Sequence, residues 1–330
     1  MKELNANNNK PRQLSIFERI NKPRQLSLFE RNSEMKMFHP YINSTSNIIG
    51  LYDLIPKYTY NKNISQSESI RRFKYNKNDY IVEITPAKIK GKEYFPGISE
   101  ERIEDVLRKF VFDGHADMFN HNKDIQCGIL FSYYQIQKEL EKYKIKYNAQ
   151  RIKHSLNILH RTHILIKTEE FEDGSTILPI FRHATKLEQA FISFHPLLTK
   201  AINESSFRYF DFEKTMICKN NIARYLIKRL FNNYKFADYF NSFDILMSTI
   251  VRDSHIFNNS PLRTRKSQIL KSLNILIDLK IINSYETLVF YDQNKSNKIY
   301  DIKFSIKGTR EFINRVKNYN SSLKNLRNSF

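Results

Sequence analysis

Hydrophobic residues recur with a helical spacing in several stretches of the chain and alternate with polar residues in others. Behind Ser99, a predicted N-cap, they return every three or four positions up to residue 111, which predicts a helix. Apolar and polar positions alternate in residues 79–84, and this pattern predicts a strand. Residues 33–66 follow neither period and are rich in Asn and Ser, so we expect a loosely ordered leader there.

The middle of the chain has the order helix, helix, strand, turn, strand. After a strand at residues 129–131, helices are predicted at 133–143 and 149–159, followed by strands at 164–167 and 176–181 around a turn at 172–175. Two short helices followed by a β-hairpin are typical of a winged helix-turn-helix. A strand at 191–194 and a short helix at 197–203 come next.

The last third of the chain has a similar order. The spacing predicts helices at 221–232, 243–251 and 263–279, then two strands at 281–291 and 297–304 around a polar turn. A helix at 308–316 with a basic, frayed end closes the pattern.

A short sequence is repeated in the two regions. Ser155-Leu156-Asn157-Ile158-Leu159 recurs as Ser272-Leu273-Asn274-Ile275-Leu276, and each copy lies in the predicted helix just before the predicted hairpin. Because the same residues stand at the same place in the order of elements, the repeat indicates a duplicated winged-helix domain.

These patterns predict an α+β protein with two winged-helix domains in tandem. We expect a disordered tail at residues 1–45, a leader at 46–95, winged-helix domains at 96–204 and 205–317, and a basic tail at 318–330.

The polar faces of the two pre-hairpin helices are candidates for DNA contact. In the second helix, basic and amide side chains crowd the amino-terminal half, which is the part of a recognition helix that enters the major groove. The predicted base-reading residues there are Arg263, Arg265, Lys266, Gln268 and Lys271. The first helix offers a second contact surface or a dimer interface with Gln150, Arg151, Lys153, His154 and Asn157. Lys295 and Lys298 in the second hairpin turn are expected to contact phosphates.

Composition supports a polyanionic partner. The chain carries 54 basic and 34 acidic residues, a net charge of +20, and counterion release makes nucleic acid the usual partner of such a protein. An RNA-binding protein with diffuse charge is an alternative, and an AT-rich genome would by itself raise the Lys content. No apolar run is long enough to span a membrane, and with only two cysteines, expected to be core thiols, we expect a cytosolic protein.

The amino-terminal tail contains a motif written twice, twelve residues apart. Its bulky apolar residues cannot build a core, so we interpret them as anchors for a pocket on another protein. The copies resemble the peptide by which bacterial replication proteins hold the DNA polymerase sliding clamp. The residues concerned are Gln13, Leu14, Ile16 and Phe17, then Gln25, Leu26, Leu28 and Phe29.

Several stretches resemble plasmid replication initiators of the RepA/TrfA kind. They are residues 95–101, Val106-Leu107-Arg108-Lys109, Tyr134-Gln135-Ile136, and Ser155 to Leu159 before His163-Ile164-Leu165-Ile166. The likeness covers roughly residues 90–317. It implies two winged-helix domains that bind repeated double-stranded origin DNA, called iterons, distort nearby AT-rich DNA and recruit host replication proteins such as an initiator and the replicative helicase. Self-association is also possible.

The sequence contains no motif that predicts an enzyme, a cofactor or a metal site. It lacks the His-x-His pair of rolling-circle initiators and a Gly-rich phosphate loop. Asp113, His115, Asp117, His121 and Asp124 are close in sequence, but a polar loop explains them better than a metal site does. The competing class is a winged-helix transcriptional regulator without a replication role.

Overall fold

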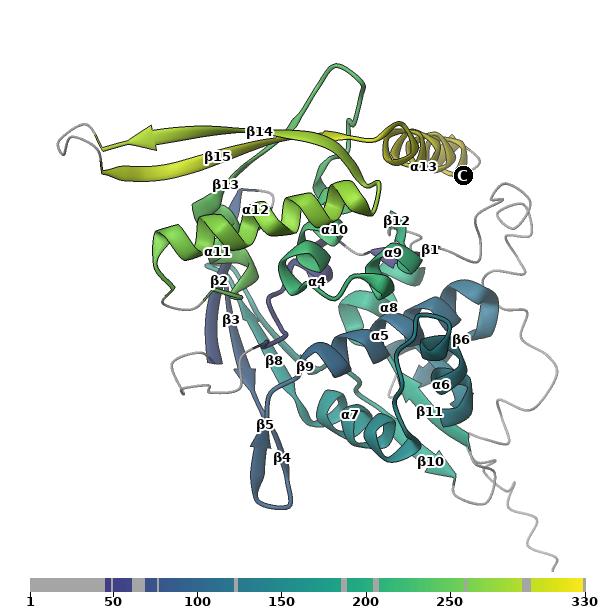
Figure 1. Ribbon diagram of the computed structural model, residues 1–330. Helices are drawn as coiled ribbons and strands as arrows, with labels where there is room; N and C mark the ends of the chain where they lie inside the picture. Colours follow the sequence, from purple (N-terminus) through teal and green to yellow (C-terminus); the bar gives the residue numbers. More distant parts are fainter. Residues whose placement is uncertain are drawn as a thin grey trace, which may run out of the picture.

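A computed structural model describes most of the chain after residue 44 (Figure 1). The described residues are 45–48, 50–60, 69–75, 77–121, 124–184, 189–203, 208–257, 260–292 and 298–328. The expected tail at residues 1–45, with both copies of the repeated motif, therefore lies outside them apart from its last residue.

The part up to residue 121 contains one long helix and several strands. Its elements are β1 (Thr45–Ile48), α4 (Gly50–Leu54), β2 (Ile70–Tyr75), β3 (Asn78–Thr85), β4 (Ala87–Ile89), β5 (Lys92–Tyr94), α5 (Ile98–Phe110), a π-helical turn (Val111–His115) and β6 (Ala116–His121).

The middle part contains the first predicted pair of helices and its hairpin. The elements are β7 (Asp124–Ser132), α6 (Tyr133–Glu141), α7 (Ala149–Arg161), β8 (His163–Lys167), β9 (Glu172–Thr176), β10 (Phe181–Ala184), β11 (Gln189–Ser193) and α8 (Pro196–Asn203). Two antiparallel sheets form here, one in the order β2-β3-β8-β9 and one in the order β10-β11-β7-β6.

The last part contains the second set of helices and a long hairpin. The elements are β12 (Arg208–Asp211), α9 (Phe212–Ile217), α10 (Asn221–Asn233), β13 (Phe243–Leu246), α11 (Met247–Ser254), α12 (Leu262–Asp278), β14 (Ile282–Tyr291), β15 (Ile299–Gly308) and α13 (Arg310–Asn328). The sheet order is β13-β15-β14, and β12 pairs with β1 from the start of the described chain.

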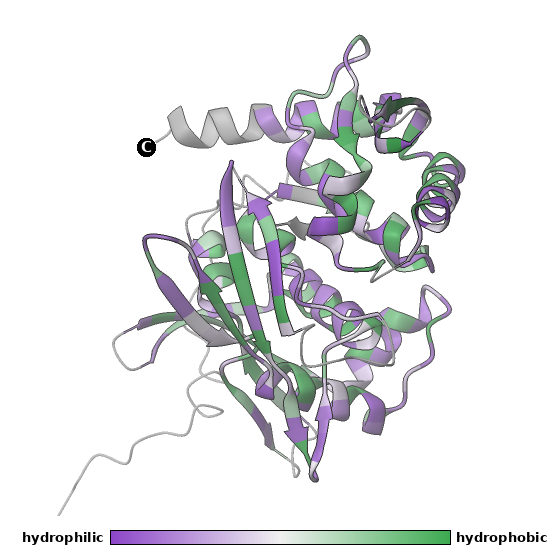
Figure 2. Cartoon of the chain, turned by 90° about the vertical axis from the view of Figure 1, so that its left-hand side faces the viewer, coloured by the Kyte–Doolittle hydropathy of each residue, from purple (hydrophilic) through white to green (hydrophobic). Residues whose placement is uncertain are grey.

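Apolar side chains from all these parts meet in a continuous core. Ile152 and Leu156 of α7 and Ile269 and Leu273 of α12 are each completely buried, as the helical spacing predicts. Figure 2 shows the strands passing from hydrophobic inner segments to largely hydrophilic outer turns. No helix in the described part of the chain has the length and apolar character needed to cross a membrane.

The first hairpin turns earlier than predicted. Residues 172–176 form strand β9, and the reversal lies at residues 168–171, where Thr168 Oγ1 accepts hydrogen bonds from the N–H groups of Glu170 and Phe171. The Asp-Gly pair that suggested a turn lies inside β9, where Gly174 is paired with Leu165 of β8. A Cβ atom at residue 174 would lie only 2.8 Å from Cε1 of His163. The glycine is needed for this close approach and not for a turn.

Residues 243–251 do not form one helix. Phe243 to Leu246 form strand β13, which pairs with β15 from Phe243 opposite Ile306 to Leu246 opposite Lys303, and the helix begins only at Met247. The apolar residues of this stretch fit both the helical spacing and the alternation of a strand. Pairing with the distant strand β15 decides in favour of the strand for residues 243–246.

Three further boundaries differ from the prediction. Residues 50–60 are not a loose leader, because α4 and the segment after it bury Tyr52, Leu54 and Ile55 in the core. The helix predicted to start at Ser99 begins at Ile98, and Glu100 accepts the N–H of Gly97 at 2.8 Å in place of a serine cap. The last helix, α13, continues to Asn328, well past the predicted end.

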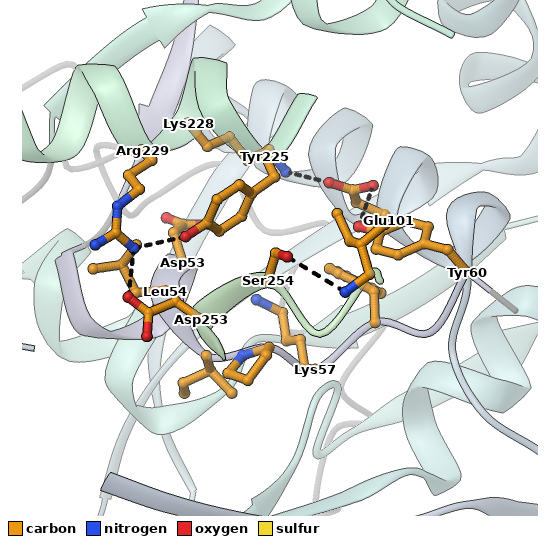
Figure 3. Close-up of a pocket in the computed structure, with 14 residues that line it drawn as sticks. Asp53, Leu54, Lys57, Tyr60, Glu101, Tyr225, Lys228, Arg229, Asp253 and Ser254 are labelled. Carbon is orange, nitrogen blue, oxygen red and sulfur yellow. Dashed lines mark hydrogen bonds and ion pairs between the residues drawn. The ribbon is translucent and has the colours of Figure 1, made fainter. Parts of the chain in front are cut away.

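Buried ion pairs join α5 of the first set of helices to α10 of the second. Arg224 donates from Nε to Glu101 at 3.3 Å and from Nη2 to Asp105 at 3.0 Å. Lys228, one turn along α10, donates to Glu101 at 3.0 Å (Figure 3) and to Asp105 at 2.8 Å. Arg224 is 0% exposed, so these ion pairs form the interior of the contact. We call this group of four side chains the ionic joint.

The segment that contains α4 lies against the ionic joint and adds its own charges. Asp53 receives two hydrogen bonds from Arg108 of α5, at 2.5 and 2.8 Å. On the other side, Arg229 donates to Asp253 at 2.9 Å and to Tyr225 at 2.7 Å (Figure 3). Tyr60 of the segment at residues 50–60 donates to Glu101 of the ionic joint at 3.1 Å, so polar contacts hold both this segment and α10 to α5.

The pKa of Glu101 shows that the neighbouring cations outweigh burial at the ionic joint. Burial alone would raise the pKa of this carboxyl group, but Arg224 and Lys228 outweigh burial and lower the pKa from 4.5 to about 2. Because the pKa in the folded state lies below its ordinary value, Glu101 stabilises the fold above about pH 4.5. This contribution is lost as the pH falls from 4.5 towards 2.

We expect Arg224→Met to lower the free energy of unfolding by about 3–5 kcal/mol, because two buried carboxylates would keep only Lys228 as a cationic partner. Urea unfolding at pH 7, followed by circular dichroism, measures this difference. Repeating it between pH 7 and pH 2 should show wild-type stability falling below about pH 4.5.

Lys88→Met is the matched control, since it removes an ion pair with Glu93 whose two side chains are largely exposed. It should change stability little. Equal losses for the two variants would contradict a structural role for the ionic joint.

Candidate nucleic-acid interface

Helix α12 is positioned by one buried face. It begins directly after Pro261, a residue whose fixed backbone angle suits the start of a helix, and the N–H of Arg265 donates to the carbonyl of Pro261 at 3.0 Å. Ile269, Leu273 and Leu276 are 0% exposed and pack towards α10 and β14. The opposite face is consequently turned to solvent over the whole length of the helix.

The predicted base-reading residues of α12 divide into two groups. Arg263, Gln268 and Lys271 are exposed on the outer face. Arg265 and Lys266 are half-buried at its edges, and Arg265 makes further contacts within the protein. Three exposed residues that the sequence analysis did not select, Thr264, Ser267 and Asn274, share the outer face. Counting three and four positions from Gln268 and Lys271 would have identified them.

The outer face of α7 is partly covered by the hairpin β4–β5. The ring of His154 lies 4.9 Å from that of Tyr94, edge to face, and Arg161 donates to the carbonyl of Lys88 at 3.1 Å. Figure 1 shows this hairpin projecting beside α7. His154 is thus engaged by its own chain.

The remaining predicted residues of α7 are more accessible. Gln150, Arg151 and Lys153 are exposed, and Asn157 is half-buried and donates to the carbonyl of Lys153 at 2.8 Å. Arg151 donates to Ser99 Oγ at 2.8 Å, and its guanidinium lies 4.0 Å from the centre of the Tyr147 ring. Arg151, His154 and Asn157 of α7 thus all make contacts within the protein.

The repeated sequence has the same structural position in both helices. Ser155 donates from Oγ to Glu100 Oε1 at 2.6 Å, and Ser272 Oγ lies 3.0 Å from Asn220 Oδ1. Glu100 accepts the backbone N–H at the start of α5, and Asn220 is the N-cap of α10. In each case the serine ties the pre-hairpin helix to the amino terminus of an earlier helix, so its place in the repeat has a packing explanation.

The hairpin after α12 extends the exposed surface. Tyr285 Oη donates to Asn274 Oδ1 at 2.9 Å and so fixes the hairpin to the helix. Lys298 is exposed at its outer end, and the N–H of Asp292 donates to the carbonyl of Lys298 at 2.8 Å. Lys295 and the eight predicted clamp-contacting residues lie outside the described residues.

The pocket beside the ionic joint carries no ligand chemistry of its own. It has a volume of about 40 Å³, and its charged lining residues, among them Asp53, Glu101 and Arg229, are paired with one another or with neighbouring residues. In the described part of the chain, no three His, Cys, Asp or Glu side chains meet as metal ligands. Cys127 and Cys218 are free and buried, as expected of core thiols, and burial raises the pKa of Cys127 to about 12.

Comparisons with known proteins find similarity only in structure. No protein-family model and no curated protein matches the chain. The chain is similar to a crystal structure of domains 2 and 3 of RctB, with a TM-score of 0.48 and 10% identity, over 78% of this chain and 96% of that chain. It is also similar to the Pi initiator protein in complex with iteron DNA, with a TM-score of 0.45 and 9% identity, over 64% of this chain and 91% of that chain.

The Pi structure is of an initiator, which is the kind of protein that the sequence resembles. Because the identities are 9–10% and the TM-scores 0.45–0.48, we base the proposed function on this chain's own residues.

We expect Ser155→Ala to lower the free energy of unfolding by about 1.5–3 kcal/mol, since the lost hydrogen bond ends on a buried carboxylate. Ser272→Ala should cost less, about 0.5–1.5 kcal/mol, because its acceptors are an amide and a carbonyl. Urea unfolding of both variants measures the two decreases in the free energy of unfolding.

Ser267→Ala controls for the change in helix propensity, because this serine is exposed on the same helix as Ser272. If Ser155→Ala unfolded no more easily than Ser267→Ala, the tie between α7 and α5 would have no energetic role.

Proposed function

We propose that this protein is a plasmid replication initiator of the bacterial cytosol. In this proposal it binds repeated double-stranded origin DNA, promotes opening of the origin, and recruits host replication proteins, including the sliding clamp, through its amino-terminal tail. A host initiator and the replicative helicase are further partners of such a protein. The proposed activity is binding and assembly and needs no catalytic residue.

The observation that carries the proposal is the outer face of α12. This face presents Arg263, Gln268 and Lys271 to solvent on a helix held rigidly by a buried opposite side. Arginine, lysine and glutamine are the side chains that read guanine and adenine edges in the major groove. The net charge of +20 supplies the attraction to phosphates that such a helix needs in order to dock.

The order of elements supports two winged-helix domains, which we place at residues 96–204 and 205–317. In the second, α10, α11 and α12 precede the hairpin β14–β15, and β13 completes a three-stranded sheet. In the first, α5, α6 and α7 precede the hairpin β8–β9, but that hairpin pairs with β3. The strand before α6, β7, pairs instead with β11 and β6, so the first domain would be a modified version of the second.

We assign base reading mainly to α12 and a supporting role to α7. Arg263, Gln268 and Lys271 would contact base edges, and the half-buried Arg265 and Lys266 would contact the flanking backbone or the edge of the groove. The face of α7, partly covered by the hairpin β4–β5, would serve as a second DNA contact or as a dimer interface. Lys298 and the neighbouring Lys295 would contact phosphates.

The amino-terminal tail separates an initiator from a transcriptional regulator. Both classes use winged-helix domains to bind DNA, but only the initiator has a reason to hold the sliding clamp. Two copies of the motif on one tail raise the effective concentration at a ring-shaped partner with several identical sites. Twelve residues extend at most roughly 40 Å, so rebinding at one site accounts for the advantage without bridging two.

We expect Arg263→Ala to weaken binding to a specific origin duplex by about 1–3 kcal/mol if the arginine contacts a guanine. The loss should be confined to sequences with that guanine. A gel-shift titration at fixed salt concentration, with the cognate duplex and a duplex mutated at one base pair, measures both effects.

Arg310→Ala removes the same charge from an exposed position at the start of α13 and serves as the control. It should weaken binding to both duplexes only slightly. Loss of the same size for the two arginines would mean that α12 contributes charge alone and does not read bases.

For the tail, we expect full-length protein to be retained on immobilised sliding clamp. The pair Leu26→Ala and Phe29→Ala should reduce retention, because these side chains would fill the apolar groove of the clamp. Leu14→Ala with Phe17→Ala tests the first copy in the same way, and all four substitutions together should abolish retention.

Asn21→Ala, between the two copies, is the matched substitution outside the motif and should leave retention unchanged. Absence of retention by the wild-type protein would remove the clamp from the proposal and favour the transcriptional regulator.

A further inference from the structure

The loop between α10 and β13 exposes aromatic side chains almost completely. Phe236 is 84% exposed, Phe240 is 95% exposed and Tyr239 is 49% exposed. Figure 1 shows this loop, the segment that joins α10 to β13, projecting from the top of the molecule. We call residues 234–242 the aromatic loop. Apolar rings at a projecting tip indicate a contact surface, because their transfer out of water is favourable.

The aromatic loop is closed by the side chain of Asn241. Its Oδ1 accepts from Tyr234 Oη and from the N–H of Asp238, both at 2.9 Å. Its Nδ2 donates to the carbonyl of Phe236 at 2.6 Å. The chain therefore reverses between Phe236 and Asn241, and the two exposed phenylalanines belong to one narrow tip.

Helix α13 holds the other side of the aromatic loop. Tyr239 Oη donates to Asn314 Oδ1 at 3.2 Å, and Lys317 donates to Asp238 Oδ2 at 3.3 Å. The ammonium group of Lys317 also lies 5.1 Å from the centre of the Tyr239 ring. Because the loop is fixed before any partner arrives, a partner does not have to order it.

The side of α13 that contacts the aromatic loop is basic. Arg310, Asn314 and Lys317 follow one another at spacings of four and three residues and therefore share one side of the helix. The side chains of Arg310 and Lys317 are both exposed. Cationic groups thus border the aromatic tip on the side where α13 supports it.

The charges around the tip add up to an excess of positive charge. Lys235, Arg310 and Lys317 face a single acidic residue of the loop, Asp238, which is paired with Lys317. Asp244, just after the loop, is neutralised by Lys303 at 3.0 Å. The whole chain carries a net charge of +20. The surface that receives the tip should accordingly be anionic.

This combination selects the surface of an anionic lipid bilayer. Aromatic side chains favour the boundary between headgroups and acyl chains, and anionic headgroups attract basic side chains. A projecting tip enters a fluid boundary without a preformed pocket of matching shape, which a protein partner would have to provide. Such a contact lies in the plane of the membrane surface and needs no spanning helix.

We propose that the aromatic loop, together with Arg310 and Lys317, is a peripheral membrane contact that places Phe236 and Phe240 in the headgroup region of an anionic bilayer. This inference goes beyond the proposed function and does not rest on DNA binding by α12. It gives the chain a second anionic surface to bind, through a different part of the fold.

The test is sedimentation of full-length protein with vesicles of equal parts phosphatidylglycerol and phosphatidylcholine, at about 150 mM salt. Wild-type protein should sediment with these vesicles. Phe236→Ala with Phe240→Ala should weaken binding at least about 10-fold, because the apolar contact is lost. Both side chains are exposed, so urea unfolding of this variant should match wild type.

Leu288→Ala with Phe290→Ala is the matched control. It removes two partly exposed apolar side chains from β14, which are 52% and 38% exposed, and should leave vesicle binding unchanged. Arg310→Gln should weaken binding to the anionic vesicles about 5-fold. Vesicles of phosphatidylcholine alone should bind wild-type protein more weakly than the anionic vesicles do.

Fluorescence reports insertion directly, because the chain contains no tryptophan. Phe240→Trp introduces a single reporter at the tip. Its emission should shift to shorter wavelength with anionic vesicles and be quenched by lipids with brominated acyl chains. Leu288→Trp places the same reporter on β14 and should show neither change.

Four results would overturn the inference. They are absence of wild-type protein from the anionic vesicle pellet, an equal loss of binding in the two double alanine variants, an unshifted emission of Phe240→Trp with vesicles, or an emission that shifts with protein concentration in the absence of lipid. The last result would make the tip a contact between copies of the chain. Each of these leaves the proposed function standing, because the DNA and clamp assays do not involve the aromatic loop.

Discussion

The contact between α5 and α10 is the constraint on which the arrangement of this protein depends. Arg224 and Lys228 on one helix meet Glu101 and Asp105 on the other inside the protein, where an unpaired charge is strongly unfavourable. A buried charge pair tolerates little sliding, because each hydrogen bond requires its partner within a narrow range of distance and angle. The ionic joint therefore fixes the relative position of the two sets of helices more sharply than apolar packing alone would.

Each pre-hairpin helix, α7 or α12, is connected to a helix of the ionic joint by a hydrogen bond from its serine. Ser155 binds Glu100, one residue before Glu101 of the joint, and Ser272 binds the N-cap of α10, the helix that carries Arg224. Hydrogen bonds and short stretches of α5 and of the start of α10 thus link α7 to α12 across the interior. This link suits the proposed function, since two helices that contact one duplex must keep a fixed separation.

The two helices nevertheless present different surfaces. The hairpin β4–β5 lies on α7 and engages His154 and Arg161, whereas α12 keeps its outer face open and gains a long hairpin beside it. The repeated sequence therefore lies in two helices whose outer faces differ, one without a covering hairpin and one partly covered by β4–β5. The proposed division into a reading helix and a supporting helix follows from this asymmetry.

The sequence by itself determined most helices, the second hairpin and the basic character of α12, because the spacing of apolar residues and the excess of Lys and Arg are local properties. It misplaced the first hairpin turn and the start of α11, because Gly174 and Phe243 belong to strands through their pairing with Leu165 of β8 and Ile306 of β15. Only the tertiary structure decided that Glu101 and Arg224 are partners and that the ring of His154 packs against Tyr94. Each of these depends on which residues distant in sequence become neighbours, and local periodicity carries no record of that.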